Sequence, residues 1–174
     1  MDQTLRTDEC CSPSAASGNS YDLIVVGAGS AGFSASITAA EAGSRVAMVG
    51  HGTIGGTCVN TGCVPSKAMI RGGEAVHGGR SAARFPGIEP CEHSVDWSAF
   101  VKGTAGLVDE MRQKKYVDLL PVYENITYIE EGPARLIEGG VEVGGRVLAA
   151  RHILIATGSR PFLPPIEGIE TVDT

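Results

Sequence analysis

The sequence predicts an α/β fold, in which helices pack on a parallel β-sheet and a small antiparallel β excursion is added near the C-terminal end. An apolar run at residues 21–26 leads directly into a glycine-rich turn and an alanine-rich helix, and a second apolar run follows at 44–49. A third, at 152–155, ends in another glycine turn. Short apolar runs that alternate with helices are typical of parallel strands buried on both faces.

The composition favours one domain without a strongly basic surface. The chain has 174 residues, which is enough for a sizeable core, and its 24 glycines suit tight turns and close approach to a ligand. The net charge is −6 and there is no run of Lys and Arg, which argues against nucleic acid or an anionic membrane as a partner. No apolar run approaches the roughly 18 residues that a membrane span needs.

We interpret residues 1–20 as a disordered N-terminal tail, because they are rich in Ser, Thr and Asp and have no periodicity. The tail has no apolar centre, so it does not resemble a secretory signal. The chain has five cysteines, an odd number, which favours a reducing cytoplasm over a secreted disulfide framework. Cys10 and Cys11 in the tail are either a pair for a soft metal ion or two incidental thiols.

The turn after the first strand has the pattern G-x-G-x-x-G, formed by Gly27, Gly29 and Gly32. The first glycine permits the tight turn, the second lets the backbone approach a pyrophosphate, and the third lets the helix pack on the strand. The helix predicted over 30–42, closed by Gly43, would receive the phosphates at its N-terminus. With a strand before it and a helix after it, this motif indicates a Rossmann-like dinucleotide-binding unit.

The second strand departs from such a unit at its end. These strands normally finish with Asp or Glu, which binds the adenosine ribose. Here the position is Gly50, followed by His51. Either a neighbour such as His51 or a water molecule replaces the acidic contact, or the affinity for the cofactor is reduced.

The stretch GGTCVNTGCVPSK at 55–67 places Cys58 and Cys63 five positions apart. On a regular helix this spacing gives a rise of about 7.5 Å, which exceeds the roughly 4.4–6.8 Å between Cα atoms that a disulfide tolerates. A disulfide therefore needs a distorted backbone, for which Gly62 can supply an unusual φ. Pro65 suits the first turn of a helix, so Cys63 would lie at the helix start, where the dipole favours a nucleophile or electron donor. The alternative is two unpaired buried cysteines in a loop.

The middle of the chain predicts two helices separated by a loop. The first helix covers 64–77, and a loop bearing Gly and Pro follows at 78–95. Cys91 in this loop is interpreted as a spectator thiol. Asp96 suits the N-cap of a long helix that extends to Val117.

The last part of the chain predicts short strands separated by glycine turns, which form the antiparallel excursion: 126–129, 132–137, 141–143 and 146–149. The apolar strand at 152–155 then ends in Ala156, Thr157 and Gly158, a turn that again brings backbone close to a bound ligand.

Together these motifs resemble the first part of a flavin-dependent pyridine nucleotide–disulfide oxidoreductase. The resemblance covers residues 21–173 and rests on the G-x-G-x-x-G turn, the cysteine motif at 55–67 and the Ala-Thr-Gly turn. Within this family, the run at 52–60 and the following Met-Ile-Arg at 69–71 most resemble the mercuric reductases.

The resemblance implies an FAD-binding fold with a redox-active disulfide against the flavin. Cys63 would be the thiol next to the flavin, Cys58 the outer thiol that meets the substrate, and Lys67 the group that tunes the flavin's reactive nitrogen. The residues that the resemblance assigns to FAD lie in glycine turns, at helix starts or near the adenine: Gly27, Gly29, Ser30, Ala31, Gly32, Gly56, Thr57, Lys67, Gly132, Ala134, Ala156, Thr157 and Gly158.

For a mercuric reductase, the resemblance implies that electrons pass from NADPH to FAD and then to Hg(II), a soft ion held transiently by the thiolates of Cys58 and Cys63. Residues 21–165 would be the first segment of the FAD-binding domain, and 166–174 a connector to an NADPH-binding domain missing from this chain. We expect a homodimer at full length, and no turnover by these residues alone.

Two alternatives remain. A dihydrolipoamide dehydrogenase or another disulfide reductase of the same family would act on a small disulfide instead of Hg(II). A chain complete as it stands would be a non-catalytic module that binds thiols or metal ions. The residues that select the substrate are expected beyond Thr174.

Overall fold

The computed structural model describes residues 18–160 and 162–171. Its centre is a six-stranded sheet with the strand order β3-β2-β1-β6-β5-β4. Neighbours among β3, β2, β1 and β6 are parallel, whereas β5 is antiparallel to β4 and β6. The α/β fold with an antiparallel excursion is therefore confirmed. The strands are β1 Ser20–Val26, β2 Val46–Val49, β3 Ile126–Ile129, β4 Arg135–Ile137, β5 Gly140–Val143 and β6 Arg146–Ile155.

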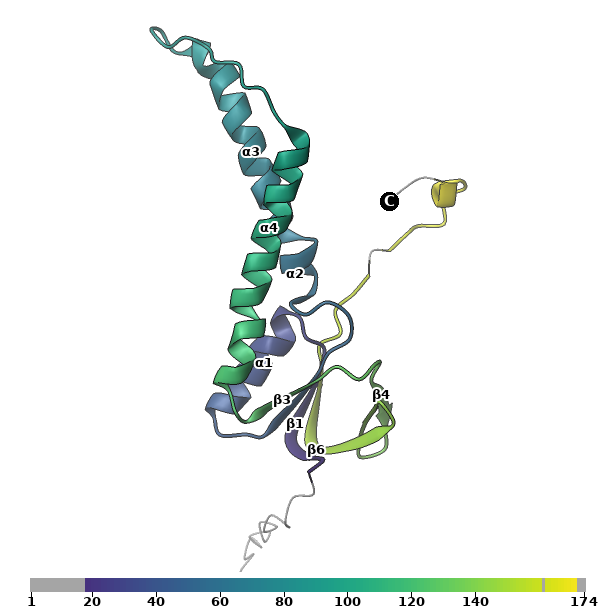
Figure 1. Cartoon of the computed structure of the whole chain (residues 1–174). Coiled ribbons are helices and arrows are strands. Elements are labelled where there is room, and N and C mark those ends of the chain that lie inside the picture. Colours follow the sequence, from purple (N-terminus) through teal and green to yellow (C-terminus); the bar gives the residue numbers. More distant parts are fainter. Residues whose placement is uncertain (1–17, 161, 172–174) are drawn as a thin grey trace, which may run out of the picture.

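The helices divide between the sheet and a long projection. α1 lies beside the sheet together with the C-terminal part of α4, whereas α3 and the start of α4 extend away from the sheet as a hairpin (Figure 1). The short α2 lies between these two parts. The helices are α1 Ser30–Glu41, α2 Gly56–Asn60, α3 Cys63–Ser81 and α4 Trp97–Lys115, with 3-10 turns at Ala82–Arg84, Val117–Val122 and Ile169–Thr171.

Each face of the sheet has an apolar core. On one face Phe33 of α1 packs with Val25 and Met48, and Tyr116 after α4 adds its ring to this cluster. On the other face, residues of β5 and β6 pack with the central strands: Tyr21, Ile24, Val26, Ala47, Val49, Ile129, Val141, Val143 and Leu148. The antiparallel excursion thus supplies one side of the core.

The parallel strands end at a common edge. Val26 pairs with Val49 and with Ile155, and Val49 pairs with Ile129. The backbone N–H groups of Gly27, Gly50 and Ala156 continue the ladder, with donor–acceptor distances of 2.8, 2.9 and 2.7 Å. Ligands of open parallel sheets bind at this carboxyl edge.

Two strand assignments were wrong. β3 does not belong to the antiparallel excursion, because it pairs parallel with β2 at the sheet edge. The Asn125 side chain fixes its start beside the α1–β2 turn, since its amide donates to the carbonyls of Ala40 and Ser44 at 2.8 and 2.9 Å. The segments predicted at 146–149 and 152–155 form one strand, β6, whose first half pairs with β5 while most of its length pairs with β1.

Several boundaries also differ. α3 continues to Ser81, so it occupies the beginning of the predicted loop, and Val117 lies in a 3-10 turn after α4 has ended. β4 starts at Arg135 rather than at Gly132, which has φ +122°. β1 begins at Ser20, inside the predicted tail. Residues 1–17 of the predicted tail, with Cys10 and Cys11, lie outside the described residues, as do residues 172–174 of the connector.

Candidate functional site

A cleft of about 530 Å³ lies at the carboxyl edge of the parallel strands. It is lined by the turns after β1, β2 and β6, by the start of α2 and by residues before β4. The sequence-predicted residues that line it are Gly27, Gly29, Ser30, Ala31, Gly56, Thr57, Ala134, Ala156, Thr157 and Gly158. Segments distant in sequence thus meet where the glycine motif predicts a dinucleotide.

The glycines of the first turn permit contacts that no side chain would allow. Gly27 has φ +123°, and a Cβ there would lie 2.1 Å from the carbonyl oxygen of Ala156. A Cβ on Gly32 would lie 1.9 Å from the carbonyl oxygen of Gly27. Gly32 does not line the cleft, and its role is the close packing of α1 on the turn.

The N-terminus of α1 is open toward the cleft. Gly29 is its N-cap residue and has no side chain to accept from the first N–H groups, which remain for a ligand. Ser30 also lines the cleft, and its hydroxyl lies 3.0 Å from that of Tyr116. Uncapped N–H groups and the positive end of the helix dipole suit a pyrophosphate.

A second glycine pair joins this turn to the cysteine segment. Gly29 forms a parallel bridge with Gly55, whose N–H donates to the carbonyl of Ala28 at 2.8 Å. A Cβ on Gly56 would lie 2.8 Å from the Cα of Gly29. The short helix that carries Cys58 is therefore held directly against the proposed phosphate turn.

The two cysteines lie on successive helices. Cys58 is in α2, and Cys63 is the first residue of α3, as Pro65 predicts. The expected unusual φ at Gly62 was wrong: φ is −110° and ψ is −111°. A glycine is favoured here because a side chain would be crowded: a Cβ on Gly62 would lie 3.0 Å from the Thr57 carbonyl oxygen. That oxygen accepts a hydrogen bond of 2.7 Å from the Gly62 N–H.

Cys58 and Cys63 are exposed, unbonded thiols, not buried ones. Neither thiol is in a disulfide, but the two interact. The pKa of the Cys58 thiol is raised first by its hydrogen bond with Cys63, then by partial desolvation and by the negative charge of Cys63. The positive charge of Lys67, one turn into α3, opposes this shift. The three residues predicted to be catalytic are thus close enough to influence one another. None of the three is among the residues that line the cleft, although Gly56 and Thr57, which precede Cys58 in α2, do line it.

Sequence reasoning missed part of the cleft wall. Pro133 lines it, whereas its predicted neighbour Gly132 does not. Thr53 after β2 also lines it. Gly50, the position where an acidic side chain is normally found, and His51, considered as its replacement, line it as well. Pattern reasoning can find such residues only by recognising that every loop after a parallel strand faces the same edge.

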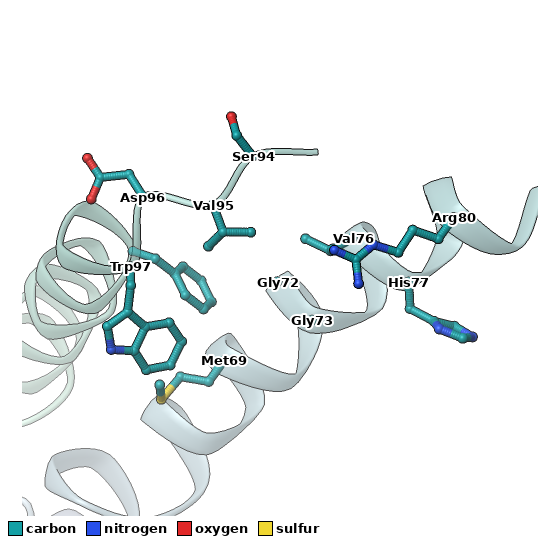
Figure 2. A pocket seen from close by; sticks show the side chains of 11 residues that line it. Met69, Gly72, Gly73, Val76, His77, Arg80, Ser94, Val95, Asp96 and Trp97 are labelled. Atoms are coloured by element: carbon teal, nitrogen blue, oxygen red, sulfur yellow. The ribbon is translucent and has the colours of Figure 1, made fainter. Parts of the chain in front are cut away.

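A larger cavity, of about 640 Å³, lies between α3 and the start of α4 (Figure 2). Met69, Val76 and Phe100 supply apolar walls, and His77 and Arg80 lie at one end. No predicted site residue lines it, and it has none of the glycine turns that recognise phosphate. We therefore place the functional site at the sheet edge.

In the part of the chain that the structure describes, no cluster of three or more His, Cys, Asp or Glu side chains is arranged to hold a metal ion. No helix among the described residues has the length and apolar character that crossing a membrane requires.

The cleft suits a flavin dinucleotide. The turns after β1 and β6 that line it approach so closely that a Cβ on Gly27 would collide with the Ala156 carbonyl, and its helix N-terminus offers uncapped N–H donors to the diphosphate. The helix that carries Cys58, α2, begins beside the same turn.

A family model described as pyridine nucleotide-disulphide oxidoreductase matches residues 21–174. The chain therefore belongs to this family. The resemblance that its motifs predict is confirmed, and the family implies a flavin cofactor.

Mercuric reductases are among its relatives. That of Streptomyces lividans is 43% identical over 159 residues, which is 88% of this chain and 33% of that protein. That of Lysinibacillus sphaericus is 43% identical over 156 residues, which is 89% of this chain and 28% of that protein. The chain also resembles the HOCl-induced flavoprotein disulfide reductase RclA from Escherichia coli, with a TM-score of 0.69 and 27% identity over 86% of this chain and 31% of that one. It thus spans about a third of the length of these relatives.

Proposed function

We propose that this chain is the first flavin-binding segment of an FAD-dependent oxidoreductase that uses NADPH to reduce Hg(II) to Hg(0). The observation that carries the proposal is the placement of Cys58 in α2 and of Cys63 and Lys67 in the first turns of α3, directly after α2. The Gly29–Gly55 bridge holds the start of α2 against the dinucleotide cleft. The similarity to mercuric reductases supports Hg(II) as the substrate. Residues 21–165 form this segment and 166–174 a connector to the NADPH-binding domain.

In this proposal the residues of the cleft hold FAD, and the cysteines exchange electrons and bind the metal ion. The α1 N-terminus and the glycine turns bind the diphosphate. Bound FAD would supply the two electrons that it takes from NADPH. The Cys58–Cys63 pair alternates between a disulfide and a dithiol, gaining two electrons and two protons on reduction.

Substrate binding follows from the exposure of the thiols. Thiolates are the preferred ligands of a soft ion, and two of them hold Hg(II) while two electrons convert it to Hg(0). The hydrogen bond with Cys63 raises the pKa of Cys58, and the positive charge of Lys67 partly offsets this by lowering it. The transient metal ligands are thus the same two cysteines. A cytoplasmic location and a homodimer belong to the same proposal, on the grounds of cysteine usage and family resemblance.

The test is NADPH-dependent formation of Hg(0) by the full-length protein. Cys58→Ser and Cys63→Ser should each lose this activity, whereas Cys91→Ser, at an exposed loop cysteine, should retain it. Unchanged turnover in either of the first two variants would remove the proposed roles.

A second candidate is reduction of a small disulfide, which the similarity to a flavoprotein disulfide reductase supports. The same assay separates the two, because a disulfide reductase would oxidise NADPH with a small disulfide and release no Hg(0).

A further inference from the structure

The ribose end of the cleft lacks the acidic side chain that dinucleotide folds usually place after the second strand. Gly50 occupies that position and lines the cleft. It is fixed at the sheet edge, because its N–H donates to the carbonyl of Ile129 at 2.9 Å. Recognition of the ribose therefore needs another group.

Tyr128 fills the space that a side chain at position 50 would need. A Cβ on Gly50 would lie 2.3 Å from the Tyr128 hydroxyl oxygen and 2.8 Å from its ring carbons. Tyr128 is opposite Met48 in the register of β2 and β3, and its ring packs in the apolar cluster on that face. Packing thus holds the ring of Tyr128 next to Gly50, and an acidic side chain at position 50 would displace this ring.

The Tyr128 hydroxyl is buried and has no hydrogen-bond partner among the described residues. Buried hydroxyl groups are normally paired, so this atom indicates a missing partner. Burial raises the pKa of Tyr128, and the nearby carboxylate of Glu130 raises it further. The phenol therefore keeps its proton and remains a donor.

We propose that the Tyr128 hydroxyl replaces the acidic residue and hydrogen-bonds to the 2′-hydroxyl of the cofactor's adenosine ribose, directly or through one ordered water molecule. The position suits this role. The hydroxyl lies behind Gly50, 2.3 Å from where a Cβ of Gly50 would be, and Gly50 lines the cleft although Tyr128 itself does not. His51 also lines the cleft, but it is exposed and can bond to solvent instead. This inference rests on the proposed FAD site.

The test measures dissociation constants of the full-length apoprotein for FAD and for an FAD analogue with 2′-deoxyadenosine. Tyr128→Phe should weaken FAD binding about 3- to 10-fold, the range of one neutral hydrogen bond. The wild type should bind the analogue more weakly by a similar factor, and the variant should no longer distinguish the two ligands. The matched control is Tyr123→Phe, which removes a hydroxyl that bonds to Glu41 at 3.2 Å and should leave FAD binding unchanged.

If the Tyr128 hydroxyl served only to stabilise the fold, its removal would lower the melting temperature of the apoprotein. Since its hydroxyl has no partner among the described residues, our proposal expects Tyr128→Phe to leave the melting temperature of the apoprotein unchanged or slightly higher. Gly50→Glu should weaken FAD binding by crowding Tyr128, because the hydroxyl oxygen and two ring carbons of Tyr128 lie within 3 Å of the new Cβ.

Three results would overturn the inference. One is a wild type that binds FAD while Tyr128→Phe binds it equally well. Another is continued discrimination against the 2′-deoxy analogue by the variant, above all if His51→Ala abolishes it. The third, a wild type that binds no FAD, would overturn the proposed function as well.

Discussion

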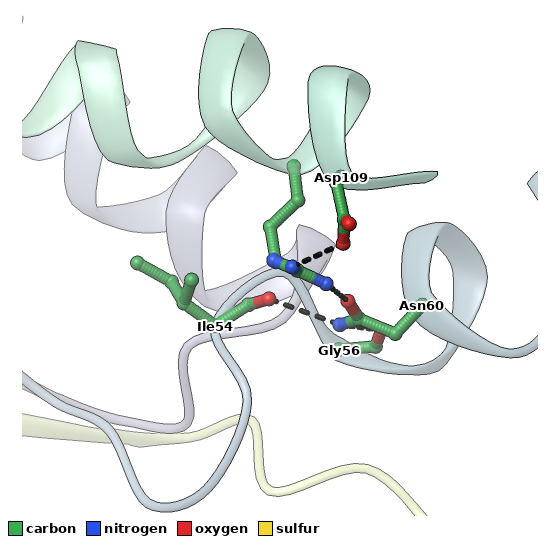
Figure 3. Close-up of polar contacts among 5 residues, drawn as sticks. Ile54, Gly56, Asn60 and Asp109 are labelled. Atoms are coloured by element: carbon green, nitrogen blue, oxygen red, sulfur yellow. Dashed lines mark hydrogen bonds and ion pairs between the residues drawn. The ribbon is translucent and has the colours of Figure 1, made fainter. Parts of the chain in front are cut away.

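The guanidinium of Arg112 on α4 donates a hydrogen bond of 2.9 Å to the side-chain oxygen of Asn60, the last residue of α2 (Figure 3). The amide nitrogen of Asn60 in turn donates to the carbonyls of Ile54 and Gly56, at 2.9 and 2.8 Å. α2 has only five residues, too few to be stable alone. This bond therefore ties the Cys58 helix to the much longer α4.

Arg112→Leu should destabilise the protein, because it leaves the half-buried oxygen of Asn60 without its charged donor. We expect the free energy of unfolding to fall by about 1–3 kcal/mol, as for a hydrogen bond to a charged group. Urea unfolding followed by circular dichroism measures this. Asp109→Asn is the control, since it removes only the exposed ion pair with Arg112, and such pairs contribute about 0–1 kcal/mol. Equal losses in both variants would disprove the tie.

Gly32→Ala should disrupt the cleft. The new methyl group would lie 1.9 Å from the Gly27 carbonyl oxygen, so α1 or the turn must shift. We expect a loss of at least about 1–3 kcal/mol of folding free energy, as for overpacking, together with weaker flavin binding. Gly78→Ala in α3, where a Cβ meets nothing within 4 Å, should instead stabilise by about 0.5–1 kcal/mol. Thermal melts of both apoproteins, with flavin fluorescence titrations, provide the comparison.

Asp96 should be replaceable by Asn but not by Ala. Its carboxylate accepts from the Ala99 N–H at 3.0 Å and caps α4, as the sequence predicts. Asp96→Ala should cost about 1 kcal/mol of folding free energy, and Asp96→Asn less, because the amide oxygen can still accept. Chemical denaturation of the two variants tests this, and identical losses would contradict the cap.

Reduced Cys58 should react slowly with iodoacetamide near neutral pH. Its pKa is raised above the ordinary value of a cysteine thiol, first by the hydrogen bond with Cys63, so little thiolate is present near neutral pH. Cys63→Ala removes the dominant cause and should move the midpoint of the alkylation profile to lower pH. Lys67→Met removes the opposing positive charge and should move it higher. Mass spectrometry of Cys58 over pH 6–10 gives the midpoints, and Cys91→Ala should not change them.

The sequence could predict those features that depend on local chemistry. The turn at Gly27, the start of α3 at Cys63 and the cap at Asp96 follow from residue types at fixed spacings, and the structure has them there. The contacts of Tyr128 with Gly50 and of Arg112 with Asn60 could not be predicted, because they join segments that only the tertiary fold brings together.

The errors have the same cause. Four apolar residues at Ile126–Ile129 predict a strand, but not which neighbour it pairs with, and the Asn125 side chain settles that through contacts with the α1–β2 turn. The spacing of Cys58 and Cys63 predicts a break between helices. It does not reveal that Gly62 suits the break because a Cβ there would crowd the Thr57 carbonyl.

The central claim is that Cys58 and Cys63 form a redox pair supplied with electrons through the flavin. The most direct test counts free thiols in the full-length, air-oxidised protein after denaturation, before and after anaerobic reduction with NADPH. We predict a gain of two thiols per chain in the wild type and in Cys91→Ser, and no gain in Cys58→Ser or Cys63→Ser. A thiol count that NADPH leaves unchanged in the flavin-loaded wild type would contradict the account.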